Sequence, residues 1–361
     1  MNRRYRVVVV GMGKRGMHHA LAFQANGRFE VAGICDIDPV RLDAAAAKLF
    51  GVVKGGNALQ VASAVKPDVF CFCTLPDLRA EMIHIGIQSG ARLIAFEKPV
   101  ALNSREGMEI KNLLAASGVK AVVSHQHRYG EHYRKVKEII DSGALGRVHT
   151  VYGTATAWMM HNLSHLIDYM RWYNGDTAAQ WVMGQAAGGG KLADVHPSPD
   201  YIAGFIQFAN GVRGVVECGA GAPDVPEVDY WWRKCRIGAQ VTEGFSEVLT
   251  AGGWRAVTKT GATSGGGRMD YDLDMSPYIQ QMADWLDDDR SVHPCNFESA
   301  YAGFEIMMAL CRSAINGGQV SLPLADTADE IEMLRVHLAG HRVLFTPVNA
   351  KEYDQQGMGM V

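Results

Sequence analysis

The first 120 residues alternate short apolar runs with longer helix-forming segments, and this alternation is the strongest constraint on the fold. We expect strands at Tyr5–Val10, Phe29–Cys35, Asp68–Thr74, Leu93–Phe96 and Lys120–Ser124. We expect helices at Lys14–Asn26, at Leu78–Ser89, at Ser104–Ala116, and from an Asp38-Pro39 cap to Phe50. Such alternation predicts a doubly wound parallel sheet with helices on both faces, and continuous apolar strands suit a sheet buried on both sides.

From about residue 124 the pattern becomes that of an α+β unit. We expect helices at Tyr133–Asp141, Asn162–Trp172, Tyr278–Asp287 and Ala300–Asn316. Strand-like segments lie between them, and Asn210-Gly211 predicts a tight hairpin between Ile202–Phe208 and Val212–Cys218. This half is therefore expected to hold a large, mostly antiparallel open sheet. Segments 184–200 and 261–276, rich in Gly, Ser, Asp and Pro, are interpreted as surface loops.

The length of 361 residues corresponds to about two domains. We place the parallel unit at 1–123, the α+β unit at 124–325, and a C-terminal helix and tail at 326–361. The 35 basic and 38 acidic residues leave a net charge of −3, so neither nucleic acid nor a membrane is expected as a partner. Seven cysteines without a Cys-x-x-Cys pair, and a start without a signal-peptide pattern, predict reduced thiols in the cytoplasm.

A glycine motif joins the first strand to the first helix. Gly11-Met12-Gly13-Lys14-Arg15-Gly16 has the form G-x-G-x-x-G. Here the first glycine permits a tight turn, the second lets the backbone approach a pyrophosphate, and the third lets the helix pack on the strand. The N–H groups of the helix N-terminus then bind phosphate. The alternative is a turn in an α/β fold that binds no dinucleotide.

An acid follows at the distance that this motif requires. Asp36 ends the second strand, 20 residues after Gly16. A carboxylate there accepts hydrogen bonds from the adenosine ribose hydroxyls and repels a 2′-phosphate. NAD is therefore favoured over NADP, although the positive charge of Arg41 would soften this preference.

Glu97-Lys98-Pro99 follows the strand Leu93–Phe96. Because ligands of open α/β sheets bind beyond the carboxyl ends of the strands, Lys98 is placed to meet a nicotinamide or a substrate. A lysine whose pKa is lowered by burial or by a neighbouring cation can act as a general acid or base. A surface ion pair is the alternative.

These motifs resemble, in order and spacing, those of the glucose–fructose oxidoreductase / inositol dehydrogenase / MocA (Gfo/Idh/MocA) family. The similar segments are Gly11–Gly16, Asp36, Thr74-Leu75-Pro76-Asp77, Glu97-Lys98-Pro99, Gly143–Arg147, Ser164–Trp172 and Val320–Pro323. The resemblance implies a Rossmann domain, an α/β domain whose open sheet builds a homodimer or homotetramer, and a tightly held nicotinamide cofactor. It implies these cofactor-binding residues: Gly11, Met12, Gly13, Lys14, Arg15, Gly16, Asp36, Thr74, Pro76, Glu97, Lys98 and Gln126.

His161, His165 and Asp168 are spaced to share one helical face. Three interpretations remain open: packing with satisfied polar groups, a metal site of two histidines and a carboxylate, or an acid/base pair facing Lys98. The resemblance favours the third, with His165 as catalytic histidine and Asp168 orienting an imidazole or anchoring the helix. We therefore expect no metal, and Lys98, His165 and His161 as the catalytic group. Inositol dehydrogenase-like members often carry Asp at the place of His161, which argues against myo-inositol as the substrate.

Further substrate-binding candidates accompany Lys98, His161 and His165. Gln126 and Arg128, in the His125–Arg128 segment after the strand Lys120–Ser124, are expected to bind a polyol or to pair between domains. Trp158 is expected to line a sugar pocket by stacking or hydrogen bonding. We expect His18 and His19 on the surface or in packing, and Trp231-Trp232 in sheet packing or an oligomer contact. For His196 a surface loop is favoured over the lining of a sugar pocket.

The resemblance implies an NAD-dependent dehydrogenase that moves a hydride between nicotinamide and a secondary hydroxyl, or keto group, of a sugar, cyclitol or related polyol. Two alternatives remain open. One is a glycosidase or lyase that recycles NAD within each turnover, and the other is a non-catalytic NAD-binding regulator.

Overall fold

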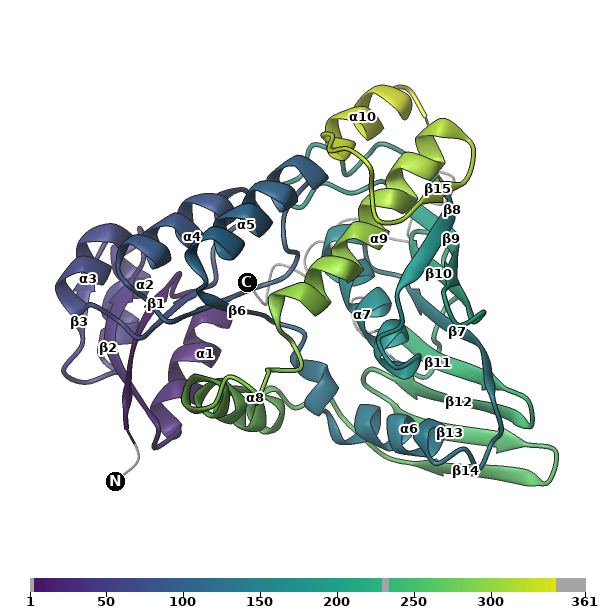
Figure 1. The fold of residues 1–361 in the computed structure, drawn as a ribbon, viewed down its shortest axis with the longest axis horizontal. Helices are drawn as coiled ribbons and strands as arrows, with labels where there is room; N and C mark the ends of the chain where they lie inside the picture. The colour runs from purple at the N-terminus through teal and green to yellow at the C-terminus, as the bar shows by residue number, and fades with distance from the viewer. Residues whose placement is uncertain (1–2, 229–233, 342–361) are drawn as a thin grey trace.

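The computed structural model describes residues 3–228 and 234–341, so Trp231-Trp232 and the tail beyond residue 341 lie outside the described residues. Figure 1 shows two sheets at opposite ends of the molecule. The N-terminal sheet has the order β3-β2-β1-β4-β5-β6, and every neighbouring pair is parallel. Its strands are β1 (Tyr5–Val10), β2 (Phe29–Cys35), β3 (Val53–Gly55), β4 (Val69–Phe72), β5 (Leu93–Phe96) and β6 (Lys120–Val123).

Helices cover both faces of this sheet, as the alternation of strand and helix predicts. Alternate side chains of β1 enter two different cores, one under α1 and α2 and the other under α3 to α5. The helices are α1 (Lys14–Ala25), α2 (Pro39–Ala46), α3 (Ala58–Val65), α4 (Arg79–Gln88) and α5 (Ser104–Ser117). A later helix, α8 (Tyr271–Asp287), packs beside α1 on the first face.

One segment of this half differs from the expected elements. The helix capped by Asp38 ends at Ala46 rather than at Phe50, whose side chain is 84% exposed. Strand β3 and helix α3 follow, and neither is expected from the pattern. The reason is that β3 has three residues, Val-Lys-Gly, at an open edge, and no apolar run marks a strand that is so short and exposed.

The second sheet has nine strands in the order β14-β13-β12-β11-β7-β10-β9-β8-β15. All its pairs are antiparallel except β10 with β7, so the expected mostly antiparallel sheet is confirmed. The strands are β7 (Val148–Ala155), β8 (Ala179–Ala187), β9 (Tyr201–Phe208), β10 (Arg213–Gly219), β11 (Cys235–Val241), β12 (Gly244–Leu249), β13 (Gly253–Thr258), β14 (Gly261–Gly265) and β15 (Val320–Ser321). Strands β9 and β10 form the expected Asn-Gly hairpin.

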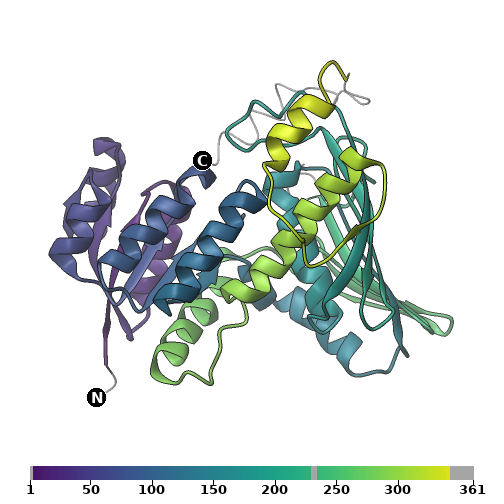
Figure 2. The same ribbon diagram turned by 45° about the horizontal axis from the view of Figure 1, so that its top comes forward.

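The two segments expected to be loops are partly regular. Residues 184–187 end β8, residues 261–265 form β14, and 271–276 begin α8. The glycines predict loops wrongly here because they permit close packing rather than a turn. A Cβ on Gly184 would lie 2.5 Å from the main-chain oxygen of Leu310. Leu310 belongs to α9 (Phe297–Asn316), which lies between the two sheets (Figures 1 and 2).

The remaining helices are α6 (Glu131–Asp141), a π-helical turn η3 (Met159–Leu163), α7 (Ser164–Tyr173) and α10 (Glu330–His337), with short 3₁₀ turns at Pro76–Leu78 and Gln126–Tyr129. Helix α10 is held against α5 and α9 because the buried Glu330 carboxylate accepts from Ser104 Oγ (2.6 Å) and Arg312 Nε (2.7 Å). Within the described residues, no helix is both long and apolar enough to cross a membrane. All seven cysteines are free thiols.

Candidate functional site

The glycine loop after β1 has the geometry that a dinucleotide needs. Gly11 has a φ of +86°, and a Cβ there would lie 2.7 Å from the carbonyl oxygen of Cys73. A Cβ on Gly16 would lie 1.7 Å from the carbonyl oxygen of Gly11, so only glycine lets α1 approach this closely. Gly13 caps α1 without a side-chain hydrogen bond, which leaves the first-turn N–H groups for an anion.

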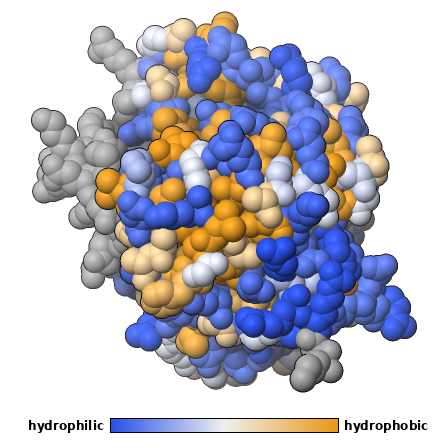
Figure 3. All heavy atoms as spheres, turned by 90° about the vertical axis from the view of Figure 1, so that its left-hand side faces the viewer, coloured by the Kyte–Doolittle hydropathy of each residue, from blue (hydrophilic) through white to orange (hydrophobic). Residues whose placement is uncertain are grey.

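Asp36 lies at the end of β2 and is buried. Its Oδ2 accepts from the Met12 main-chain N–H at 2.5 Å, and its Oδ1 accepts from the Asp38 N–H at 2.8 Å. The carboxylate thus shapes the loop and keeps lone pairs for ribose hydroxyls. Beside it, Ile37 is 92% exposed and Val40 is 75% exposed. Figure 3, which faces this end of the molecule, shows apolar side chains gathered among hydrophilic ones.

Arg79 joins two loops at the carboxyl edge of the sheet, and no sequence motif points to it. It is 1% exposed, and its guanidinium donates to the carbonyl oxygens of Thr74 (3.0 Å) and Pro99 (3.2 Å). It therefore holds the segment after β4, which contains Thr74 and the buried Pro76, beside the Lys98-Pro99 segment after β5. A buried arginine bound to carbonyl oxygens leaves positive charge at this edge.

Arg15, the fifth residue of the glycine motif, turns away from solvent toward Glu97. Its Nε and Nη2 atoms lie 3.1 and 3.0 Å from Glu97 Oε1. Gln126 fits between Arg15 and Ser124 when its amide oxygen accepts from Arg15 Nη2 (3.0 Å) and its nitrogen donates to the Ser124 carbonyl (3.1 Å). Burial raises the pKa of Glu97, but Arg15 and His19 outweigh it and hold that pKa well below its usual range.

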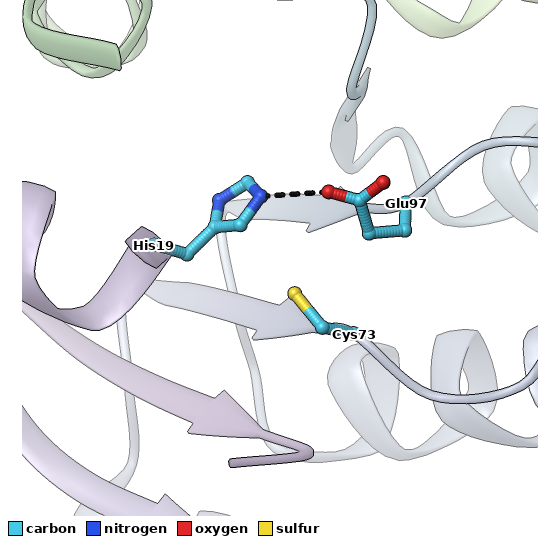
Figure 4. Close-up of side chains that lie close together, drawn as sticks. All are labelled: His19, Cys73 and Glu97. Carbon is cyan, nitrogen blue, oxygen red and sulfur yellow. Dashed lines mark hydrogen bonds and ion pairs between the residues drawn. The ribbon is translucent and has the colours of Figure 1, made fainter. Parts of the chain in front are cut away.

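His19 lies on α1 and is fully buried, so of its two expected places packing is the right one. Its Nε2 lies 3.1 Å from Glu97 Oε1. The Cys73 thiol faces the same pair (Figure 4). Hydrogen bonding by the Cys71 thiol and the nearby His19 lower the pKa of Cys73 to about 6. Against the effect of burial, Cys73 and Glu97 raise the pKa of His19 to about 9.

Lys98 connects the two halves of the molecule. Its ammonium group donates to the main-chain oxygen of His161 at 3.0 Å. Burial lowers the pKa of Lys98 to about 8; Glu97 opposes this shift, while Arg15 and Arg79 add to it. The edge of the Rossmann sheet therefore carries a lysine whose neutral form is accessible near neutral pH.

Two imidazoles lie around Lys98 in the second domain. His165, on α7, has its Nδ1 3.1 Å from the Tyr169 hydroxyl and its ring 5.3 Å from that of His125. Burial and the Lys98 charge hold the pKa of His165 well below its usual range. Burial, Lys98 and His196 lower the pKa of His161 to about 3, so both imidazoles are neutral at physiological pH.

His196 is not the surface residue that its loop composition suggests. It is only partly exposed, and its ring centroid lies 4.7 Å from that of His161. Burial and the Lys98 charge lower its pKa to about 4. The loop is held in place because Ser198 Oγ accepts from the Met160 main-chain N–H at 3.1 Å. Trp158 also lies near His161, with ring centroids 6.0 Å apart.

The histidine helix differs from its expected geometry in two ways. His161 lies in the π-helical turn η3, so it does not share a regular α-helical face with His165 and Asp168. The second concerns Asp168, whose carboxylate binds Arg128 through contacts of 2.7 Å to Nε and 2.9 Å to Nη2 and also lies 3.7 Å from Nδ1 of His125. Arg128 is buried and also contacts Asp176 at 3.0 Å. Of the roles open to Arg128, the contacts favour pairing over polyol binding.

Among the described residues, one group brings three possible metal ligands together, and it is not the histidine helix. The donor atoms of His19, Cys73 and Glu97 all lie within 4.8 Å of one another. His161, His165 and Asp168 form no such group in the same part of the chain. Sequence reasoning misses the first group because its members are 54 and 24 residues apart along the chain.

The fold and the residues at the carboxyl edge of the parallel sheet define a class of protein. Its members have a dinucleotide-binding Rossmann domain and a second domain that brings histidines to that edge. Residues 5–125 match the family model described as "Oxidoreductase family, NAD-binding Rossmann fold". Residues 133–230 match the C-terminal domain model of the same family. The chain belongs to the Gfo/Idh/MocA family of oxidoreductases. The resemblance, the fold class and the NAD-binding character expected from the motifs are confirmed.

A curated relative agrees with this assignment. The chain is 26% identical over 143 residues to an inositol 2-dehydrogenase of Rhizobium meliloti (strain 1021), and the alignment covers 40% of this chain and 42% of that protein. The chain thus matches less than half of the length of this curated relative.

Two solved structures share the fold. An oxidoreductase from Agrobacterium radiobacter, in complex with NAD+, L-tartaric acid and magnesium, has a TM-score of 0.73 at 15% identity, covering 88% of this chain and 98% of that one. The WlbA dehydrogenase from Bordetella pertussis, in complex with NADH and UDP-GlcNAcA, has a TM-score of 0.72 at 19% identity, covering 90% and 99%.

Proposed function

We propose that this protein is an NAD-dependent dehydrogenase that oxidises a secondary hydroxyl of a sugar, cyclitol or related polyol, or reduces the matching ketone. The observation that carries the proposal is the position of Lys98. Its ammonium group lies at the carboxyl edge of the Rossmann sheet, bonded to the main chain of His161, with the neutral imidazole of His165 nearby. Lys98 is thus an acid/base group that lies between the dinucleotide-binding loop and side chains able to hydrogen-bond a substrate.

The cofactor is supported by the residues that would hold it. The open face of Gly13 and the uncapped N-terminus of α1 suit a pyrophosphate. Asp36 suits the adenosine ribose hydroxyls, and the exposed Ile37 side chain offers apolar surface to a flat base. Arg41 reaches this loop, since its Nη1 would lie 4.0 Å from a Cβ on Gly13. NAD, when bound, supplies the hydride acceptor.

The side chains supply proton transfer and substrate orientation. Neutral Lys98 takes the proton of the reacting hydroxyl, and in the reverse direction its ammonium form returns the proton to the ketone oxygen. Because Tyr169 occupies Nδ1 of His165, the Nε2 of His165 remains to hydrogen-bond the same hydroxyl.

His161 and His196 would bind neighbouring hydroxyls. Each neutral imidazole can donate one hydrogen bond and accept another, which is the pattern that a diol satisfies. The Nδ1 atom of His161 is buried without a hydrogen-bond partner in the described structure. Such a group costs free energy until a ligand satisfies it. Trp158 would cover an apolar face of the ring.

We also propose a cytoplasmic homo-oligomer with domains divided near residue 124. Free thiols in all seven cysteines suit a reducing compartment. Met183 on β8 and Phe205 on β9 are 47% and 58% exposed on neighbouring strands of the open sheet, and a second copy would cover them.

The test is NADH formation, followed by its absorbance, over a panel of sugars, cyclitols and glycosides. The proposal expects stoichiometric NADH from at least one polyol. Bond cleavage in a glycoside without net NADH would instead support cofactor recycling. Tight NAD binding without hydride transfer from any compound would support a regulator.

A further inference from the structure

Three neighbouring strands of the Rossmann sheet each end in a polar side chain. Phe72 on β4 pairs with Phe96 on β5, and Phe96 pairs with Val123 on β6. The residues that follow are Cys73, Glu97 and Ser124, so they form an in-register row at the carboxyl edge. Side chains in register on parallel strands point to the same face, with strands about 4.8 Å apart. The row therefore presents a sulfur atom and two kinds of oxygen to one space.

His19 of α1 contacts two members of this row. Its Nε2 lies 3.1 Å from Glu97 Oε1 and 3.3 Å from Ser124 Oγ. Figure 4 shows the Cys73 sulfur pointing toward the same space as the His19–Glu97 pair. The donor atoms of His19, Cys73 and Glu97 lie within 4.8 Å of one another. Zinc bonds of about 2.0–2.3 Å would draw them together by about 1 Å, which side-chain rotation can supply.

We propose that His19, Cys73 and Glu97 form a binding site for a zinc-class divalent cation, with Ser124 or water in the fourth position. Thiolate, imidazole and carboxylate are the three ligand types that zinc takes in proteins, and three protein ligands with one open position are typical of its catalytic sites. The thiolate favours zinc over the oxygen-seeking magnesium and calcium. Zinc needs a deprotonated thiol and a neutral imidazole, so binding should release any proton that these groups carry.

Arg15 is the main competitor of the cation. Its guanidinium occupies Glu97 Oε1, and Lys98 and Arg79 add further positive charge to this edge. The cation must therefore displace Arg15 from Glu97 Oε1, and Arg15 lies in the first turn of α1, directly after the glycine loop. Occupancy of the site and the position of the loop are linked, and removing the charge of Arg15 should strengthen cation binding.

The experiment is a titration of the chelator-treated full-length protein with Zn2+ against a chromophoric chelator, repeated with Co2+. We expect one ion per chain and a thiolate-to-cobalt absorption band. Cys73→Ala and His19→Gln should each weaken Zn2+ binding at least about tenfold, and the cobalt band should vanish in the first. Arg15→Gln should bind more tightly. Cys311→Ala, which removes another buried thiol, is the matched control and should bind as the parent does.

Unchanged affinity in Cys73→Ala, or no binding by the parent protein, would overturn the proposal. If the variants fail to fold, alkylation of the parent protein with peptide mapping decides the question. Zn2+ should protect Cys73 from alkylation, and equal labelling with and without Zn2+ counts against the site. None of these readouts depends on dehydrogenase activity, so the site and the proposed function stand or fall separately.

Discussion

The ammonium group of Lys98 and the main-chain oxygen of His161 are joined by a hydrogen bond of 3.0 Å. Lys98 follows β5 of the Rossmann sheet, and His161 lies in the π-helical turn before α7. The bond therefore links the cofactor half of the molecule to the half that carries the histidines. A main-chain acceptor orients the lysine without adding a negative charge that would raise its pKa.

Replacing Lys98 tests its proposed role as the proton acceptor. Lys98→Met should lower kcat by about 10²–10⁴, the usual range for one acid/base group. The dissociation constant of NAD should change little, because the glycine loop and Asp36 remain. Steady-state kinetics and NAD titration by calorimetry measure the two quantities. Lys48→Met, at an exposed position, is the control. Near-parental kcat in Lys98→Met would remove this residue from the chemistry.

The pH profile of oxidation should report the lowered pKa of Lys98. The base form must be present, so kcat/KM should rise with pH and level off above about 8. An ordinary lysine would place this rise near pH 10. Arg15→Gln removes a cation that lowers the pKa of Lys98, and should move the rise to higher pH. The profile should be measured with a chelator present, so that no metal ion at Glu97 alters the charge near Lys98. A rise that stays in place in the variant would contradict the assignment.

His161 is expected to act in substrate binding more than in turnover. His161→Ala removes a donor and acceptor and leaves a substrate hydroxyl unpaired. The KM should rise roughly five- to hundredfold, equivalent to about 1–3 kcal/mol, with a smaller change in kcat. The exposed His337 supplies the control substitution His337→Ala. A fall in kcat at constant KM would instead place His161 in the proton transfer.

Asp168 should matter for stability through Arg128. Burial opposes its ionisation, but Arg128 and His125 lower the pKa of Asp168 below its usual value. A carboxyl whose pKa is lower in the folded than in the unfolded protein stabilises the fold at pH values above its pKa in the unfolded protein. This contribution is lost as the pH falls through the pKa of the folded protein. Asp168→Asn should cost about 3 kcal/mol at neutral pH, because it leaves a buried guanidinium partly unpaired.

Urea unfolding across pH checks this prediction. The gap in the free energy of unfolding between the parent and Asp168→Asn should be full at pH 7 and should narrow below about pH 4. The exposed Asp194 provides Asp194→Asn as a control, for which only a small change in the free energy of unfolding is expected. A gap that widens in acid would show that the pair does not stabilise the protein in this way.

Most of the Rossmann half could be predicted because its signals are local. The glycine loop, its helix and Asp36 lie within 26 residues, from Gly11 to Asp36, and each follows from a strand end or a helix start. The position of Lys98 at the sheet edge likewise follows from the end of strand β5 alone. The exceptions are β3 and α3, because a three-residue edge strand leaves no periodic pattern.

The second half shows what local patterns leave open. The spacing of His161, His165 and Asp168 suggests one helical face, but a π-helical turn separates the first from the other two. Asp168 then pairs with Arg128, 40 residues earlier, and its carboxylate also lies 3.7 Å from the imidazole of His125. His196 reaches His161 only because its loop folds back onto η3.

The amino-acid sequence by itself determined the parallel sheet, the dinucleotide loop and the lysine at the sheet edge, because each depends on residues close together in the chain. The tertiary structure alone decided which side chains meet: His161 with His196, Asp168 with Arg128, and His19 with Cys73 and Glu97. The physical reason is register. Which residues become neighbours across strands is set by the pairing and packing of whole elements, and no short segment encodes it.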